Sequence, residues 1–333
     1  MPEMNYKELP VDETSIVPTE SEKGQESGHD VADFEKLFQA YFSKKPEKEN
    51  AVRIKSLVQA VQNIDQAESE KEIDQIYEQI QSGVISGSAD DYHNAAVSFS
   101  RRQQNERAVR VCKVGLKKWP DNIDLNADAL TYAMDAGLTD ELEELAAALQ
   151  RNCPDRSRWN WRGFRFLFLY YIKVKPDGYE EKTKNLIEEY KKYIPADERA
   201  YMCEYERYQG LGKPDEAVQA LEEAVTNLKA PQCALTLADI YFERADYDDA
   251  IRTATLGIAY AAEPQPGIRT SYLLMLRAMA KDAALLRKGN FSDKEVQEVL
   301  KEYKLAQKYV SIRERRVIDL RIDILQTYAS LPE

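Results

Sequence analysis

The sequence has few of the residues from which metal sites and disulfide frameworks are built. Its 333 residues include four cysteines and two histidines. No two cysteines stand in a CxxC spacing, so an ordinary zinc site is not expected. Scattered cysteines on helical segments indicate packed, reduced thiols. We therefore expect no metal and no cofactor. The four cysteines are Cys112, Cys153, Cys203 and Cys233, and the two histidines are His29 and His93.

Glycine and proline are also scarce, at 13 residues each, which disfavours a β-protein dense in turns. Alanine, leucine, glutamate and lysine recur throughout and favour helices. The sequence lacks phosphate-binding loops, HExxH helices and GxSxG turns. A cysteine nucleophile would need a histidine partner, and no catalytic carboxylate pair stands out among 58 acids. We therefore predict an all-α protein that is not an enzyme.

No apolar run is long enough to cross a bilayer. The most apolar stretch, residues 163–171, is far shorter than a membrane span and contains Arg165. The first residues show no basic-then-apolar secretion signal. The net charge of −12 also disfavours general binding to phosphate backbones or anionic membranes. We expect a soluble, cytoplasmic protein without a membrane partner.

Composition divides the chain into four parts. Residues 1–30 carry a net charge of −6 and are interrupted by prolines and glycines, so we expect a disordered acidic tail, with a short docking motif as the alternative. Residues 31–88 hold apolar residues at helical spacing and should form about three N-terminal helices. Residues 89–264 are repetitive. Residues 265–333 are expected to form C-terminal capping helices, which an array of repeats needs at its open end.

Four segments of the chain repeat the same spacing of five small or large apolar residues. Successive members are separated by 3, 9, 4 and 3 residues. Small residues allow two antiparallel helices to cross closely, and a single helix pair cannot cover its own apolar face, so the pairs should stack. The sets are Ala96, Phe99, Ala108, Cys112 and Gly115; Leu130, Ala133, Leu142, Ala146 and Leu149; Tyr205, Tyr208, Ala217, Leu221 and Ala224; and Ala238, Tyr241, Ala250, Ala254 and Gly257.

This pattern resembles the tetratricopeptide repeat, a 34-residue helix-turn-helix with a small residue early in its second helix and a closing proline. Pro120 and Pro154 are 34 residues apart and close the first two units. The resemblance covers residues 89–156 and 198–264, with an irregular unit at 157–197. It implies a right-handed superhelix of antiparallel helix pairs, a tetratricopeptide-like α-solenoid.

The sequence departs from the repeat pattern in two places. Within the irregular unit we expect helices near 158–174 and 179–193, and Gly163 lies inside the first of them. The closing proline of the third copy is missing or displaced to Pro231.

Residues 151–173, the basic stretch, stand out in an acidic protein. Six bases and one acid give the basic stretch a net charge of +5, and aromatic residues lie between the charges. Arg158, Trp161, Arg165 and Phe168 would share one face of a helix, and arginine and tryptophan are common anchors of interfaces.

Three interpretations of the basic stretch stay open. In the first, the aromatics are core and the arginines are solvated or pair with neighbouring acids. In the second, the stretch is a binding hot spot for an acidic or C-terminal peptide. In the third, it stacks on single-stranded nucleic acid. The tail of residues 1–30 could also fold over it as an autoinhibitory ligand.

The resemblance implies that the first helix of each unit lines a concave groove. In one subclass a lysine and asparagine clamp holds peptide C-termini, but the matching positions hold other residues here, which disfavours a chaperone-tail co-adaptor. They are His93, Val97, Ala127, Thr131, Met202, Glu206, Leu235 and Asp239. Acids near the groove suggest a basic peptide instead; they are Asp128, Asp135, Glu206, Asp239 and Glu243.

The resemblance therefore favours a protein- or peptide-binding adaptor, scaffold or regulatory subunit. The alternatives are an intracellular peptide sensor whose array changes curvature, and a nucleic-acid-associated protein that uses the basic stretch. The candidate partner-binding residues are Arg158, Trp161, Arg165, Phe168, His93, Asp128, Glu206 and Asp239. For His93, a satisfied surface histidine is the simpler interpretation.

Overall fold

The computed structural model describes residues 56–67, 69–261 and 268–329. The chain divides into two compact units, Met1–Arg53 and Ile54–Glu333, and only the second contains described residues. The expected acidic tail and the first of the expected N-terminal helices therefore lie outside the described residues.

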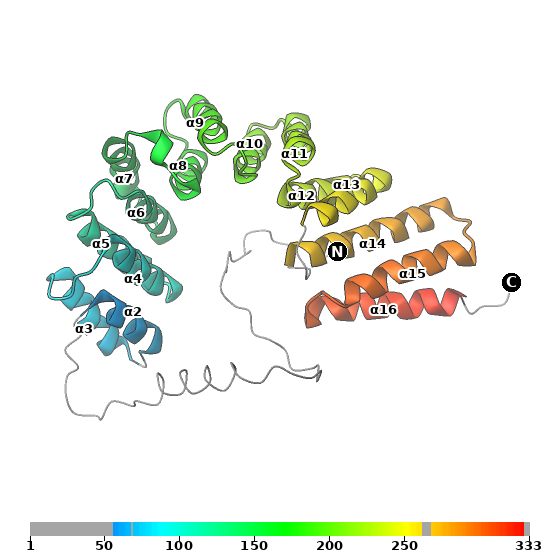
Figure 1. Cartoon of the computed structure of the whole chain (residues 1–333), viewed down its shortest axis with the longest axis horizontal. Coiled ribbons are helices and arrows are strands. Elements are labelled where there is room, and N and C mark those ends of the chain that lie inside the picture. Colours follow the sequence, from blue (N-terminus) through cyan, green and yellow to red (C-terminus); the bar gives the residue numbers. More distant parts are fainter. Residues whose placement is uncertain (1–55, 68, 262–267, 330–333) are drawn as a thin grey trace, which may run out of the picture. The chain divides into compact units, whose positions relative to one another are not determined.

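Every regular element in the described part of the chain is a helix (Figure 1). The helices are α2 (Leu57–Gln66), α3 (Glu70–Gln81), α4 (Ala89–Arg101), α5 (Asn105–Leu116), α6 (Ile123–Ala136), α7 (Thr139–Asn152), η1 (Arg156–Arg158, a 3₁₀-helix), α8 (Trp161–Val174), α9 (Tyr179–Tyr193), α10 (Arg199–Gly210), α11 (Pro214–Leu228), α12 (Pro231–Glu243), α13 (Tyr247–Tyr260), α14 (Ile268–Lys288), α15 (Asp293–Gln307) and α16 (Ile312–Ala329).

Local side-chain chemistry begins several of these helices. The Ser88 hydroxyl accepts a hydrogen bond from the Asp91 backbone N–H at 3.2 Å, and the Asp91 carboxylate accepts one from the Ser88 N–H at 2.7 Å. This reciprocal capping box satisfies donors that the first helical turn leaves unpaired. Pro231, which the sequence suggested as a displaced closing residue, is instead the first residue of α12. Proline suits this position because its missing N–H would have no partner there.

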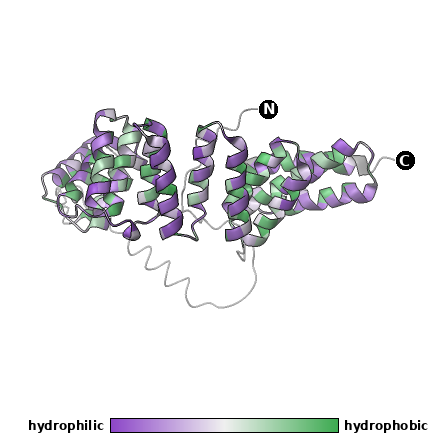
Figure 2. Ribbon diagram, turned by 90° about the horizontal axis from the view of Figure 1, so that it is seen from above, coloured by the Kyte–Doolittle hydropathy of each residue, from purple (hydrophilic) through white to green (hydrophobic). Residues whose placement is uncertain are grey.

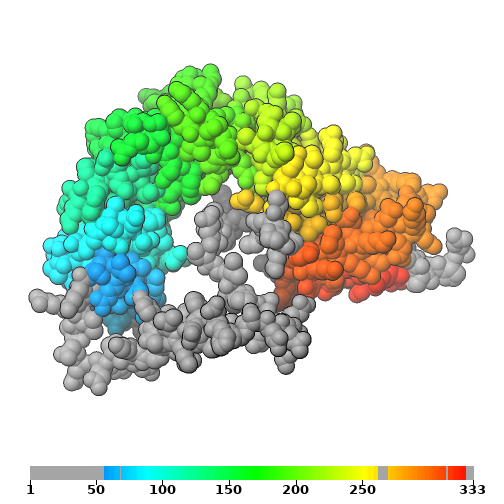
Figure 3. All heavy atoms as spheres, viewed as in Figure 1, coloured from blue at the N-terminus to red at the C-terminus, as the bar shows by residue number. Residues whose placement is uncertain are grey.

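Successive helices pair and the pairs stack side by side. Each α-helix from α5 to α16 packs against the α-helix before it, and the first helices of neighbouring pairs also touch: α4 contacts α6, α6 contacts α8, α8 contacts α10, and α12 contacts α14. The space-filling view shows neighbouring pairs of the second unit abutting in chain order (Figure 3). The described part of the second unit is thus an all-α solenoid of tetratricopeptide-like helix pairs. We use "first helices" for α4, α6, α8, α10 and α12.

The small residues of the repeat pattern lie where helices cross. Ala108, Ala217 and Ala250 are fully buried. Gly163, the apparent departure in the irregular unit, is also buried on α8, and a Cβ there would lie 2.9 Å from Ile123 Cγ2 on α6. This glycine therefore continues the close-packing pattern. Tyr208, expected as a core aromatic, is only half-buried.

The helices are amphipathic, and each carries both hydrophilic and hydrophobic residues in Figure 2. All four cysteines are buried free thiols, and burial raises the pKa of Cys153 to about 11 and that of Cys203 to about 12. Among the described residues, no helix combines the length and apolar character that a membrane span requires.

Candidate partner-binding surface

Charged side chains connect four consecutive first helices. His93 Nδ1 on α4 lies 2.5 Å from Asp128 Oδ2 on α6, and the other oxygen of Asp128 accepts a hydrogen bond from Arg162 on α8. Arg165, also on α8, donates two hydrogen bonds to the Glu206 carboxylate on α10, at 2.8 and 2.9 Å. We name these five residues the charged row. Their pairing links side chains from four consecutive first helices.

Asp128 is the buried centre of the charged row. Its side chain is 1% exposed, whereas those of His93 and Arg162 are 26% and 23% exposed. A buried carboxylate is costly unless it is paired and hydrogen-bonded, so its two partners are structurally necessary. Burial, followed by the charge of Asp128, raises the pKa of the nearby Tyr132. Asp128 was expected to contact a partner, but it is too buried to do so; it holds His93 and Arg162, whose side chains are partly accessible.

Trp161 provides an aromatic platform beside the charged row. The indole is half-buried and packs against the core. The Arg199 guanidinium on α10 lies 4.3 Å from the ring centre, and that of Arg162 lies 5.7 Å away. Cation–π contacts of this kind hold an aromatic ring in place. The first turn of α8 thus presents a positioned tryptophan between two arginines.

Of the four residues expected to share an exposed helix face, Arg158 lies outside the helix, and Phe168 lies on α8 but is buried. Asn160 caps α8 by accepting hydrogen bonds from the backbone N–H groups of Arg162 and Gly163, so that α8 begins at Trp161. Arg158 therefore lies in the preceding 3₁₀-helix and is exposed. Phe168 is 1% exposed and belongs to the core. Its expected role at the binding surface is wrong, because a buried ring cannot meet a partner without unfolding.

Every arginine in the basic stretch faces an acid. Arg156 lies 3.4 Å from Glu189, and Arg158 lies 3.8 Å from Asp121. The remaining pairs are Arg151 with Glu144, Arg162 with Asp124 and Asp128, and Arg165 with Glu206. The positive charge that is concentrated in the sequence is therefore offset by acids of neighbouring helices. This arrangement agrees with the first of the three interpretations.

Acidic residues gather instead around Tyr205 on α10. Burial raises the pKa of Tyr205, and the charges of Glu243, Glu206 and Asp239 raise it further. Glu206 is paired with Arg165, while Glu243 and Asp239 come from α12. Three of the five acids expected near a groove thus lie close to Tyr205, and the charge of Arg244 there acts against theirs.

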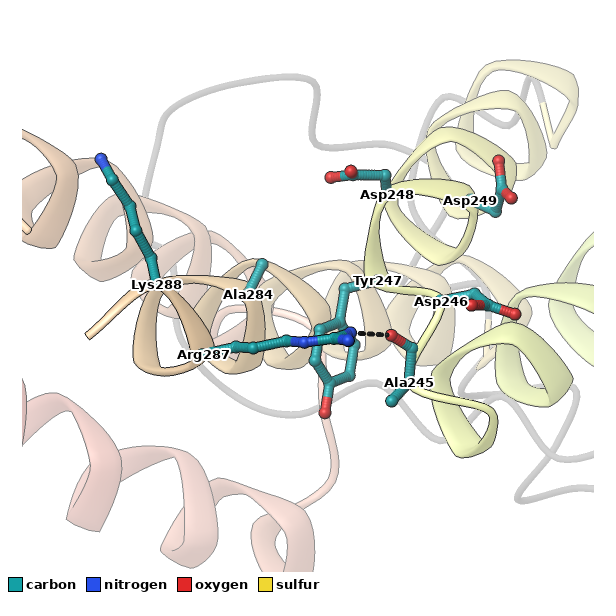
Figure 4. A pocket seen from close by; sticks show the side chains of 8 residues that line it. All are labelled: Ala245, Asp246, Tyr247, Asp248, Asp249, Ala284, Arg287 and Lys288. Atoms are coloured by element: carbon teal, nitrogen blue, oxygen red, sulfur yellow. Dashed lines mark hydrogen bonds between the residues drawn. The ribbon is translucent and has the colours of Figure 1, made fainter. Parts of the chain in front are cut away.

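An open pocket of about 480 Å³ lies between the α12–α13 turn and the end of α14 (Figure 4). Arg287 crosses it, donates a hydrogen bond to the Ala245 carbonyl at 2.9 Å and lies beside the Tyr247 ring. None of the predicted binding residues lines this pocket. In the described ranges, no group of three or more histidine, cysteine or acidic side chains is arranged to hold a metal ion.

No protein-family model matches the sequence, and no curated protein matches it either. Among solved structures, the chain is similar to the tetratricopeptide repeat protein TTC0263 of Thermus thermophilus, with 18% identity and a TM-score of 0.41 over 60% of this chain and 100% of that one. A tetratricopeptide repeat protein of Parabacteroides merdae shares 13% identity at a TM-score of 0.43, over 81% of this chain and 98% of that one. Pseudomonas aeruginosa pilF shares 16% identity at a TM-score of 0.44, over 70% and 97%.

Proposed function

We propose that this protein is a scaffold, adaptor or regulatory subunit that binds a protein or peptide segment across its first helices. The observation that supports the proposal is that the charged row links four first helices and that the partly exposed Trp161 lies beside it. Arginine and tryptophan dominate the energetics of protein interfaces when they are held in well-packed positions. Here Trp161 is flanked by Arg162 and Arg199, and Arg165 is fixed by two hydrogen bonds to Glu206. A partner would therefore meet side chains that lose little freedom on binding.

The charges favour a basic segment over an acidic one. The arginines of α8 already have carboxylate partners, so an acidic ligand would have to displace Asp128 or Glu206. Three acids, Glu206, Asp239 and Glu243, lie around Tyr205, together with two arginines, Arg244 and the Arg165 that pairs with Glu206. A segment with an apolar or aromatic side chain over Trp161 and basic groups over α12 would complement both features.

The same pairing weakens the nucleic-acid alternative. Phosphate binding releases counterions in proportion to the positive charges that are available, and each arginine of the basic stretch is offset by an acid. We expect the affinity of the full chain for single-stranded oligonucleotides to be negligible at physiological salt, as measured by fluorescence anisotropy. Tight binding with a steep dependence on salt would reverse this preference.

A peptide-display selection tests the proposal directly. The full chain is immobilised, peptides are selected from a random library, and their affinities are compared between the wild type and Trp161→Ala. We expect enrichment of basic peptides with an aromatic or aliphatic residue, and a loss of affinity of about thirtyfold or more in the variant.

Tyr193→Ala provides a matched control. Tyr193 is an exposed aromatic residue on α9, a second helix of the same unit, and Lys192 lies 4.9 Å from its ring centre. This variant removes a similar cation–aromatic contact outside the proposed surface, so the affinity should not change. Equal losses in both variants, or no selected peptide at all, would contradict the proposal. Thermal unfolding of each variant verifies that the fold is retained.

A further inference from the structure

The last helix, α16, has apolar residues on two opposite faces. One face is ordinary core, because Ile318, Ile322 and Leu325 are buried in the cluster formed with α14 and α15. The orientation of α16 is fixed by Arg321, which donates two hydrogen bonds to the Asp282 carboxylate on α14. The helix is therefore firmly docked, and its remaining face points away from the core.

That remaining face carries Val317, Leu320 and Ile324, which we name the outer stripe. Val317 is 71% exposed and Leu320 is 63% exposed, and Ile324 is half-buried. Spacings of three and four residues place the three side chains on one face of a helix. The outer stripe has the apolar pattern of a helix that packs against another helix.

Two charges beside the outer stripe indicate what would cover it. Arg316 lies four residues before Leu320 and Asp323 lies three residues after it, so both flank the outer stripe on the same side. Neither side chain has an ion-pair partner among the described residues. In an antiparallel helix pair related by a two-fold axis, positions on the same flank of the two helices face each other. Arg316 of each copy would then meet Asp323 of the other copy, which gives two equivalent ion pairs.

The charges also select the register. The register that pairs Arg316 with Asp323 places Val317 of one copy against Leu320 of the other. A shift by one heptad would bring the Asp323 carboxylates of both copies together, which like-charge repulsion disfavours. We propose that the outer stripe is a self-docking surface, on which a second copy of this chain binds through an antiparallel pairing of α16 helices.

Sedimentation equilibrium of the full chain tests the pairing. Because the contact consists mainly of one helix face from each copy, we expect a reversible dimer with a dissociation constant on the order of 10 µM. Leu320→Glu places an unpaired charge from each copy in the interface and should weaken the dimer by about a hundredfold or more. Val84→Glu is the matched control, because Val84 is 68% exposed but lies in the turn after α3. It should leave the dimer unchanged.

Charge exchange tests the antiparallel register itself. Arg316→Glu and Asp323→Arg should each weaken the dimer by roughly tenfold, because each replaces two symmetric attractions by repulsions. The double variant restores both pairs with reversed polarity and should recover the affinity of the wild type. The four positions substituted in these tests, Val84, Arg316, Leu320 and Asp323, are all exposed, so circular dichroism should show an unchanged fold for every variant.

Three results would overturn the proposal. One is a chain that stays monomeric at concentrations well above the expected constant. In that case, a lower unfolding temperature for Leu320→Glu than for Val84→Glu would indicate that another segment of the same chain covers the outer stripe. The second is a dimer that is indifferent to Leu320→Glu. The third is a double charge variant that remains as weak as either single one.

Discussion

Replacing Gly163 by alanine should destabilise the array, although alanine is the better helix former. A Cβ at this position would lie 2.8 Å from Trp159 Cε3 and 2.9 Å from Ile123 Cγ2. The indole of Trp159 cannot yield easily, because it is 3% exposed and its Nε1 donates a hydrogen bond to the Cys153 carbonyl at 2.8 Å. The Arg156 guanidinium also lies 3.7 Å from the ring centre.

Two opposing terms set the magnitude. Alanine in a helix interior is favoured over glycine by about 1 kcal/mol. Forcing an extra methyl group into a packed core costs about 1 to 3 kcal/mol. Both contacts of the added Cβ would be closer than packed atoms tolerate, so the steric cost should lie near the upper end of that range. The net loss in unfolding free energy should then be about 2 kcal/mol, or roughly 3 to 4 °C in melting temperature for a unit of this size.

Thermal and urea unfolding, followed by far-UV circular dichroism, would measure the loss. Gly210→Ala is the control, because Gly210 is the last residue of α10 and a Cβ there would meet no atom within 4 Å. That variant should be neutral or slightly stabilised. If Gly163→Ala stabilised the protein as much as the control, the close crossing of α6 and α8 would be refuted.

Two further predictions concern buried and partly buried charges. Arg162→Met leaves Asp128 without its arginine and should lower the unfolding free energy by about 3 kcal/mol. Adding Asp128→Leu should recover more than half of this loss, because the double variant leaves no unpaired buried charge. Urea unfolding would measure both variants, and a double variant whose loss equals the sum of the two single losses would contradict the prediction. The hydrogen bond from Lys113 is the main cause that lowers the pKa of Glu141 in the folded chain. The ionised Glu141 therefore stabilises the fold at any pH above the pKa that Glu141 has in the unfolded chain, and this stabilisation is lost as the pH falls through its pKa in the folded chain. Glu141→Gln should therefore cost about 0.5 to 1 kcal/mol at neutral pH, and this cost should disappear once the pH lies below the lowered pKa of Glu141 in the folded chain. Urea unfolding across the pH range would measure it, and a difference that persists in acid would exclude the charge as its cause.

Helix periodicity made most of the fold predictable. The helices expected near 158–174 and 179–193 appear as α8 and α9, because three-and-four spacing and turn residues act within a few positions of one another. The start of α8 was missed by three residues. Asn160, whose side chain accepts two backbone hydrogen bonds, was the signal that could have corrected it.

The candidate surface was only partly predictable. Trp161 and Arg165 lie on α8 with accessible surface, and the structure pairs His93 with Asp128 and Arg165 with Glu206. These pairs were not expected, because helical periodicity identifies a face but does not tell which residues of the next helix will meet it. Phe168 went to the core for the same reason, since the direction of each face is fixed by its neighbours on both sides.

The sequence by itself determined that this chain makes helical hairpins with small residues at their crossings, because propensity, spacing and capping are local properties. Only the tertiary structure decided where the charges act. Arg162 meets Asp128 across 34 residues of sequence, and Arg165 meets Glu206 across 41. A stretch with a net charge of +5 along the chain is therefore offset in space, because electrostatic energy depends on the distance between charges and not on their order in the sequence.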